Sequence, residues 1–100
     1  MKRVIRTAEF SAWFNKLKDR QAVAKIAIRI DRLGLGNPGD VKPVGDGVSE
    51  MRIDYGPGYR VYFAERHGIV VILLREGTKK TQQQDIKEAK RIYKEWKDQK

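Results

Sequence analysis

The sequence predicts an α+β domain in which a mostly antiparallel sheet of four to five strands packs against an N-terminal αα-hairpin and a C-terminal helix. Three observations support this fold class. Apolar residues recur with helical spacing over residues 10–33, alternate or run together over residues 48–74, and return to helical spacing over residues 86–96. Helices segregated from a run of strands are typical of α+β folds, and the length suits one domain, expected to span residues 1–100.

The first third of the chain predicts a short strand followed by two amphipathic helices. Val4 and Ile5 form the strand, and Thr7 can cap the first helix. Asp19 can cap the second helix, and Gly34 supplies its end. The expected apolar stripes are Phe10, Trp13, Phe14 and Leu17 on the first helix, and Val23, Ile26, Ala27, Ile30 and Leu33 on the second.

Four further strands are expected in the middle of the chain. A short strand lies near residues 41–44. Alternating apolar and polar residues predict half-buried strands over residues 50–55 and 59–64, joined by a Gly-Pro-Gly turn. Residues 67–68, His-Gly, suit a tight hairpin turn, and residues 69–74 are apolar throughout. The last segment therefore predicts a strand that is buried on both faces.

The C-terminal segment predicts one more amphipathic helix. Thr81 and Gln84 match the Thr-x-x-Gln capping box that often precedes a helix. The residues expected on its apolar side are Ile86, Ala89, Tyr93 and Trp96, while Lys and Glu occupy the other faces.

Composition excludes several classes of protein. The chain has no cysteine, which excludes a disulfide framework, a thiolate nucleophile and a thiolate zinc site. It has one histidine, His67, so a multi-histidine metal site is excluded, and we expect neither a metal nor a cofactor. No apolar run reaches the ~18 residues that span a bilayer, and no signal-peptide core follows the basic start. We therefore expect a cytoplasmic protein.

Positive charge is concentrated at the two ends of the chain. The formal net charge is +9. Residues 1–34 hold nine basic against three acidic side chains, residues 35–76 five against six, and residues 77–100 eight against four. Such an excess commonly serves a polyanion, either nucleic acid or an acidic protein, although a solubilising surface is the alternative.

The expected strand pairing places a group of polar side chains on one face of the sheet. Pairing Tyr55 with Tyr59 across the turn sets Asp54 opposite Arg60. The tight turn at residues 67–68 then sets Arg60 opposite Arg75. The side chains expected on this face are Glu50, Arg52, Asp54, Arg60, Tyr62 and Arg75.

Other interpretations of this face stay open. Asp54 and Arg60 can form an ordinary cross-strand ion pair, and Tyr62 can serve surface packing. In the expected strand, Val71 and Leu73 would lie on the same face as Arg75, and two apolar side chains do not fit an open polar face. Either the C-terminal helix covers part of the face or the register differs by one residue.

A face of this kind suits an RNA backbone. Arginine binds phosphate through two parallel hydrogen bonds, and tyrosine can stack on an unstacked base. Cleavage by attack of the 2′-hydroxyl needs a base, cations around the phosphorane and an acid for the leaving 5′ oxygen. We assign Glu50 as the base, Arg52 and Arg60 as the stabilising cations, and Lys79 or Lys80 as phosphate clamp or acid. The further candidates for RNA binding are Tyr62, Arg75, Lys25, Arg29 and Arg32.

Several segments together carry a family resemblance. They are residues 47–53 (GVSEMRI), residues 58–63 (GYRVYF), Leu73-Leu74, and residues 79–82 (KKTQ) before Asp85, Ile86 and Ala89; Phe10, Trp13 and the loop at Gly36-Asn37 fit the same pattern. In this order they resemble the RelE/ParE toxin superfamily, and more narrowly the HigB-like addiction module killer proteins. The match covers essentially the whole chain.

The resemblance implies a RelE-like fold and a type II toxin that inhibits translation by ribosome-dependent, metal-independent mRNA cleavage. It also implies a cognate antitoxin that wraps or caps the protein, with the ribosome and mRNA as further partners. Residues 59–60 correspond to the family's Tyr-Arg position. Glu50 and Arg52 fall on the strand before it, and Lys79 and Lys80 on the basic segment after the last strand.

The sequence departs from the family pattern in one segment. Ribonuclease members carry a tyrosine or histidine near the end of the catalytic sheet, whereas residues 78–84 (TKKTQQQ) contain neither. This departure leaves the general acid unidentified. It also leaves two alternatives open, a ParE-like toxin that poisons DNA gyrase and a non-catalytic nucleic-acid-binding module suggested by the basic outer faces of the N-terminal helices.

Overall fold

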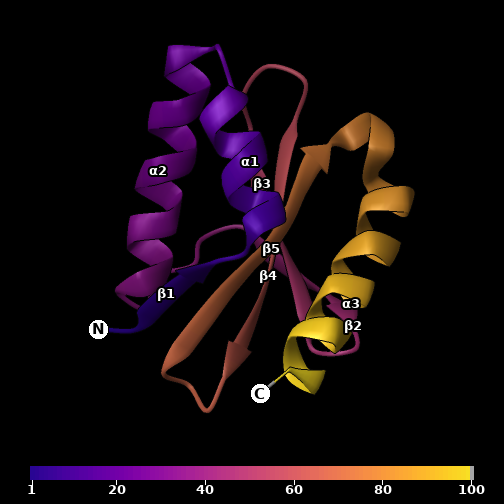
Figure 1. Ribbon diagram of the computed structural model, residues 1–100. Helices are drawn as coiled ribbons and strands as arrows, with labels where there is room; N and C mark the ends of the chain where they lie inside the picture. Colours follow the sequence, from indigo (N-terminus) through magenta and orange to yellow (C-terminus); the bar gives the residue numbers. More distant parts are fainter. Residues whose placement is uncertain (100) are drawn as a thin grey trace.

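The computed structural model describes residues 1–99 and has the expected order of one strand, two helices, four strands and one helix (Figure 1). The strands are β1 (Arg3–Arg6), β2 (Val41–Gly45), β3 (Val48–Ile53), β4 (Tyr59–Arg66) and β5 (Val70–Thr78). The helices are α1 (Ala8–Lys16), α2 (Arg20–Gly34) and α3 (Gln82–Asp98), with a 3₁₀ turn, η1 (Lys79–Thr81), before α3. Within residues 1–99, no helix is both long enough and apolar enough to cross a membrane.

The five strands form one mixed sheet in the order β1-β5-β4-β3-β2. The pairs β2–β3, β3–β4 and β4–β5 are antiparallel, whereas β1 runs parallel to β5. The expectation of a mostly antiparallel sheet is therefore corrected at this edge. Short turns join β2 through β5 and impose antiparallel pairing, but no turn joins β1 to β5 and fixes its direction.

Helices cover both faces of the sheet, with α1 and α2 on one side and α3 on the other (Figure 1). The core under α1 and α2 includes Phe10, Ile26, Leu33, Met51, Val61 and Leu73. The core under α3 includes Val48, Tyr62, Ala64, Ile72, Leu74 and Ala89. The two expected N-terminal helices are present, but an αα-hairpin is not confirmed, since both bury their apolar stripes in a core shared with the sheet.

Side chains cap the first two helices as the sequence predicts, but not the third. Thr7 accepts a hydrogen bond from the Phe10 N–H, and Asp19 accepts from the N–H groups at the start of α2. The capping box of Thr81 and Gln84 is wrong, because Thr81 makes no side-chain cap on α3. Its hydroxyl donates to the Asp85 carboxylate instead, which ties η1 to the first turn of α3.

A β-bulge in β5 explains the parity problem that the sequence poses. Tyr62 lies opposite Arg75, yet the next residue of β4, Phe63, lies opposite Leu73. Leu74 is therefore the extra residue, and the alternation of β5 shifts by one at this point. Val71 and Leu73 belong to the core under α1 and α2, while Leu74 packs under α3.

The register of β3 with β4 differs by two residues from the expected one. Arg52 lies opposite Arg60, and Glu50 lies opposite Tyr62. The expected pairing of Asp54 with Arg60 is wrong, because β3 ends at Ile53 and Asp54 lies exposed in the following turn. A shift of two residues keeps the parity of a strand, so Glu50, Arg52, Arg60 and Tyr62 still share one face.

Glu76, opposite Val61 on β5, makes stability depend on pH. Burial raises the pKa of its carboxyl from 4.5 to about 7. The folded protein thus holds this proton to a higher pH than the unfolded chain, so its contribution to stability falls as the pH rises from 4.5 to about 7. We expect Glu76→Gln to unfold at a higher urea concentration than the wild type at pH 8 and at the same concentration at pH 4. An identical difference at both pH values would contradict this assignment.

Candidate functional site

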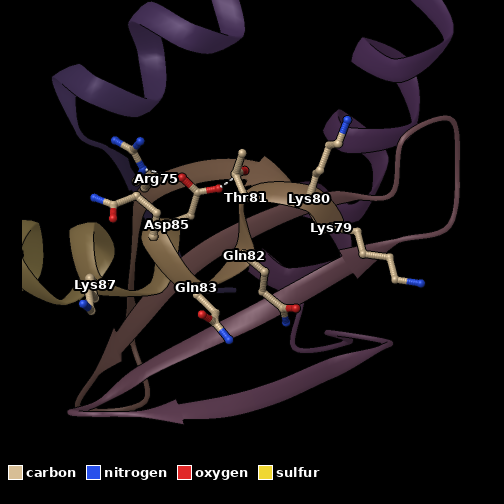
Figure 2. Close-up of a pocket in the computed structure, with 9 residues that line it drawn as sticks. Arg75, Lys79, Lys80, Thr81, Gln82, Gln83, Asp85 and Lys87 are labelled. Atoms are coloured by element: carbon tan, nitrogen blue, oxygen red, sulfur yellow. Dashed lines mark hydrogen bonds and ion pairs between the residues drawn. The ribbon is translucent and has the colours of Figure 1, made fainter.

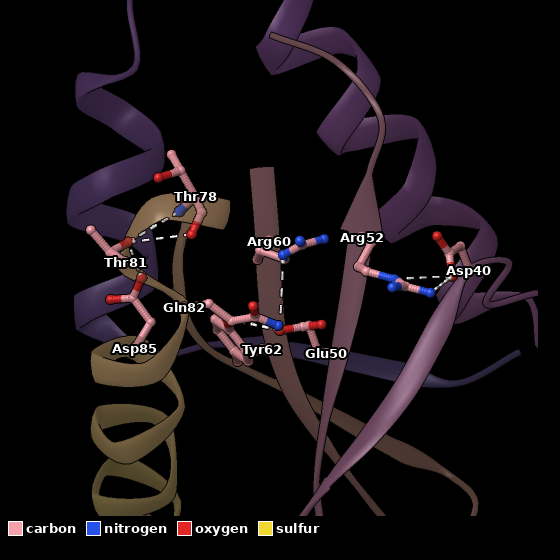
Figure 3. Close-up of polar contacts among 9 residues, drawn as sticks. All are labelled: Asp40, Glu50, Arg52, Arg60, Tyr62, Thr78, Thr81, Gln82 and Asp85. Atoms are coloured by element: carbon pink, nitrogen blue, oxygen red, sulfur yellow. Dashed lines mark hydrogen bonds and ion pairs between the residues drawn. The ribbon is translucent and has the colours of Figure 1, made fainter. Parts of the chain in front are cut away.

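Along β3 and β4 the α3-side face changes from apolar to polar toward the end where β5 leads into η1 (Figure 3). On β3 the order on this face is Val48, Glu50, Arg52, and on β4 it is Ala64, Tyr62, Arg60. Val48, Ala64 and Tyr62 belong to the core under α3. The polar residues therefore continue strands that are held in place by packing in the core under α3.

Glu50 is the buried centre of this polar region. It is 1% exposed and accepts hydrogen bonds at Oε2 from the Tyr62 hydroxyl at 3.0 Å and from the Gln82 Nε2 at 2.7 Å. The Arg60 Nε lies 4.0 Å from the same oxygen. Burial, together with the negative charge of Glu50, raises the pKa of Tyr62, which keeps the phenol protonated as a donor.

Two buried atoms of this cluster have no hydrogen-bond partner among the described residues. They are the second carboxylate oxygen of Glu50, Oε1, and the Nε of Arg60. One is an acceptor and the other a donor, and buried groups of both kinds are normally satisfied. A hydroxyl group, which donates and accepts, has the chemistry to satisfy both.

A shallow pocket of about 350 Å³ adjoins this cluster and gathers three predicted cations. Arg52, Arg60 and Lys79 line it together with Asp40 and Asp54, which are the acidic residues on its wall. Lys79 reaches the pocket because its backbone N–H donates to the Gly58 carbonyl at 2.9 Å, which fixes the start of η1 against the β3–β4 turn. The arrangement offers two guanidinium groups and one ammonium group to an anion of phosphate size.

Arg52 is held in place by the segment before β2. Its Nε and one terminal nitrogen donate to Asp40 at 3.3 and 2.8 Å, and this pairing raises the pKa of Arg52. Arg29 of α2 organises the same segment by donating to the backbone carbonyls of Arg52, Pro38 and Asp40. Arg29, predicted to bind RNA, thus directs its guanidinium to three backbone carbonyls.

We expect Asp40→Asn to strengthen RNA binding at this pocket. The ion pair is exposed, so its loss changes stability by less than about 1 kcal/mol, and the freed Arg52 gains one phosphate contact. Titration of a short single-stranded RNA should show severalfold tighter binding, and the slope of log K against log salt should steepen by about one. Weaker binding by Asp40→Asn would instead mean that Asp40 positions Arg52 for its ligand.

A second pocket of about 700 Å³ lies on the other side of Lys79, around the start of α3 (Figure 2). Arg75 lines it but is tied to Asp85, with 2.9 Å between its Nε and Oδ1. The other lining residues are Lys79, Lys80, Thr81, Gln82, Gln83, Gln84, Asp85 and Lys87. Lys79 thus lines both pockets, whereas Lys80 lines only the second one.

The other residues predicted to bind RNA either lie away from this region or are buried within it. Lys25 and Arg32 are exposed on α2, which lies on the opposite side of the sheet. Tyr62 is fully buried, so its ring is not available for stacking on a base. Asp40 and Gln82 were not identified from the sequence, because both act through contacts with residues 12 and 32 positions away.

The fold and this region define a class of protein, a small basic α+β domain with a cationic surface at one end of a mixed sheet. The chain belongs to the family described as phage derived protein Gp49-like (DUF891), which matches residues 12–97. It is 53% identical over 89 residues to an uncharacterized protein of Haemophilus influenzae, a match that covers 89% of this chain and 90% of that protein. No solved structure is significantly similar to it.

Proposed function

We propose that this protein is the toxin of a type II toxin–antitoxin system and inhibits translation by cleaving mRNA on the ribosome. One observation carries the proposal: Arg52, Arg60 and Lys79 converge on one pocket beside the buried carboxylate of Glu50. The sequence resemblance to RelE/ParE toxins supports it. A cognate antitoxin, the ribosome and mRNA are the partners that this function requires, and the cytoplasm is its location.

The chemistry follows from the groups at the pocket. The ribose 2′ oxygen attacks the adjacent phosphorus, the bond from phosphorus to the 5′ oxygen breaks, and the products end in a 2′,3′-cyclic phosphate and a 5′-hydroxyl. Arg52 and Arg60 stabilise the extra negative charge of the phosphorane. Oε1 of Glu50, which is buried and has no hydrogen-bond partner among residues 1–99, takes the 2′ proton through a bridging water, and Lys79 or Lys80 gives a proton to the leaving 5′ oxygen.

The arrangement of the aromatic residues favours a substrate that is positioned by another molecule. Every Phe, Trp and Tyr side chain of residues 1–99 is buried or half-buried. Proteins that bind single-stranded RNA unaided usually stack bases on aromatic side chains at their surface. Dependence on the ribosome, which holds mRNA in a fixed geometry, fits a protein that supplies cations but no stacking surface.

The test is mapping of RNA 5′ ends after the purified protein is added to a translating extract. Discrete cuts should arise within codons of translated mRNA and should disappear when initiation is blocked. Cuts that persist without translation would show that cleavage does not depend on the ribosome. Intact mRNA with arrested protein synthesis would overturn it.

Two observations favour the alternative of a gyrase poison. Residues 78–84 contain neither tyrosine nor histidine, and Gln82 is engaged with Glu50 rather than free to act on a substrate. For this alternative we expect double-strand DNA breaks in cells, supercoiling inhibition in a purified gyrase assay, and uncut mRNA. The two assays together separate the two toxins.

A further inference from the structure

Charge is segregated between the two flanks of α3. Lys87, Lys90, Lys94 and Lys97 follow one another at spacings of three, four and three residues, which places them along one side of the helix. We call these four residues the lysine flank. On the other side, Arg91 is paired with Glu88 at 3.0 Å and with Glu95 at 2.7 Å, so these three residues together carry one net negative charge.

The lysine flank is only weakly engaged within the protein. Lys87 and Lys94 make no ion pair with any of residues 1–99. Lys90 lies 3.6 Å from Asp46, whose side chain is 75% exposed, and such a pair contributes little to stability. The Lys97 ammonium lies 4.6 Å from the centre of the Tyr93 ring. Compensation of the helix dipole does not explain the set, because Lys87 lies in the first half of α3.

The lysine flank continues the cationic surface of the candidate site. Lys87 lines the same pocket as Lys79 and Lys80 of η1 (Figure 2). Lys90, Lys94 and Lys97 line a second hollow further along the helix, beside the β2–β3 turn. From Lys87 to Lys97 the helix rises about 15 Å, so positive charge extends from the pockets along most of α3.

We propose that the lysine flank binds the phosphate backbone of double-stranded RNA. A regular row of ammonium groups matches the regular row of phosphates along one strand of a duplex. Among residues 1–99 no Phe, Trp or Tyr side chain is exposed, which argues against an unpaired strand, since such a strand is usually read by stacking. The proposal deepens and rests on the proposed function, because a ribosome-dependent protein must dock on a surface rich in RNA helices.

The test compares RNA binding by two matched double variants, each of which removes two exposed lysines. Lys87→Ala/Lys94→Ala alters the lysine flank, whereas Lys16→Ala/Lys18→Ala alters the end of α1 and its connection to α2. Alanine favours helix, so the flank variant should fold as the wild type does, which circular dichroism checks. The probe is a labelled 15-base-pair RNA hairpin, titrated by fluorescence anisotropy over a range of salt concentrations.

We expect the flank variant to bind the hairpin about tenfold more weakly near 0.1 M salt. Its slope of log K against log salt should become about two units shallower. The α1 variant should keep at least half of the wild-type affinity and at least half of the wild-type slope. Equal losses in the two variants would show that only net charge matters and would overturn the proposal. Unchanged binding by the flank variant, or equally tight binding of an unpaired strand, would also overturn it.

This binding assay does not depend on cleavage. A protein that binds the hairpin through the lysine flank but leaves mRNA intact would refute the proposed nuclease and keep the RNA-binding surface. Discrete mRNA cuts by the flank variant at the wild-type rate would support the proposed nuclease and refute a role of the lysine flank in docking. The two proposals can therefore fail separately.

Discussion

Substitution of Arg60 by alanine is expected to lower the rate of mRNA cleavage by about 10²- to 10³-fold, the effect of removing one fixed donor from a transition state. Arg60 lies at the boundary between the pocket and the buried carboxylate of Glu50, and its side chain is 12% exposed. Its charge is therefore shielded from water and acts strongly on a nearby phosphate. The measurement is the initial rate of cutting at one mapped site in a translating extract.

Two further variants make this prediction decisive. Arg60→Lys keeps the charge but loses the two-pronged geometry of the guanidinium, so it should retain an intermediate rate. Lys16→Ala removes an exposed cation from α1, which packs on the other face of the sheet from Arg60, and should cut as the wild type does. Thermal unfolding of each variant separates loss of chemistry from loss of structure. Wild-type cutting by folded Arg60→Ala would refute the catalytic assignment.

Substitution of Gly77 by alanine is expected to give the largest loss of stability among the changes considered. A Cβ at this position in β5 would overlap the carboxylate of Asp85 and would lie 3.0 Å from the Thr81 hydroxyl. Both groups belong to the network that joins η1 to α3, so either Asp85 loses its bonds to Arg75 and Thr81 or the first turn of α3 moves away from the sheet. Overpacking of this kind costs about 1–3 kcal/mol. In a 100-residue domain each kcal/mol lowers the melting temperature by roughly 4–8 °C.

Gly34→Ala is the matched control, because its Cβ would meet only the Val4 side chain, at 3.3 Å, and one backbone oxygen at 3.9 Å. Gly34 closes α2, where alanine favours the helical conformation, so stability should change by less than about 1 kcal/mol. Gly77→Ala should also weaken RNA binding, since Lys79 and Lys80 move with η1. A melting temperature equal to that of the wild type would show that α3 shifts freely on the sheet.

Local sequence signals predicted the elements of this fold well. The order of strands and helices, the caps at Thr7 and Asp19, and the doubly buried strand β5 follow from spacing and side-chain chemistry over a few neighbouring residues. The direction of β1, the two-residue shift of β3 and the bulge at Leu74 depend on contacts between distant segments. Periodicity within one strand carries no information about such contacts.

The sequence predicts on which face of the sheet the site residues lie, but not the hydrogen bonds that connect them. Strand alternation placed Glu50, Arg52 and Arg60 on one face, and the structure brings them together. No local pattern indicates that Arg29 binds the backbone carbonyls around Asp40, or that Gln82 donates to Glu50. Both contacts depend on tertiary packing: Arg29 reaches the residues beside β3 from α2 on one face of the sheet, and Gln82 reaches Glu50 from α3 on the other face.

The bulge at Leu74 divides β5 into a mostly buried part before it and a half-buried part after it. Val71, Ile72 and Leu73 are fully buried and alternate between two cores, so their sizes are fixed by packing. After the extra residue, Arg75 faces α3 and is only half-buried. Deleting Leu74 would restore regular alternation, which leaves Arg75 on the α3 side and Glu76 on the other side but removes an apolar side chain from the core under α3. The inserted residue thus adds an apolar side chain to the core under α3 without changing the face on which Arg75 meets Asp85.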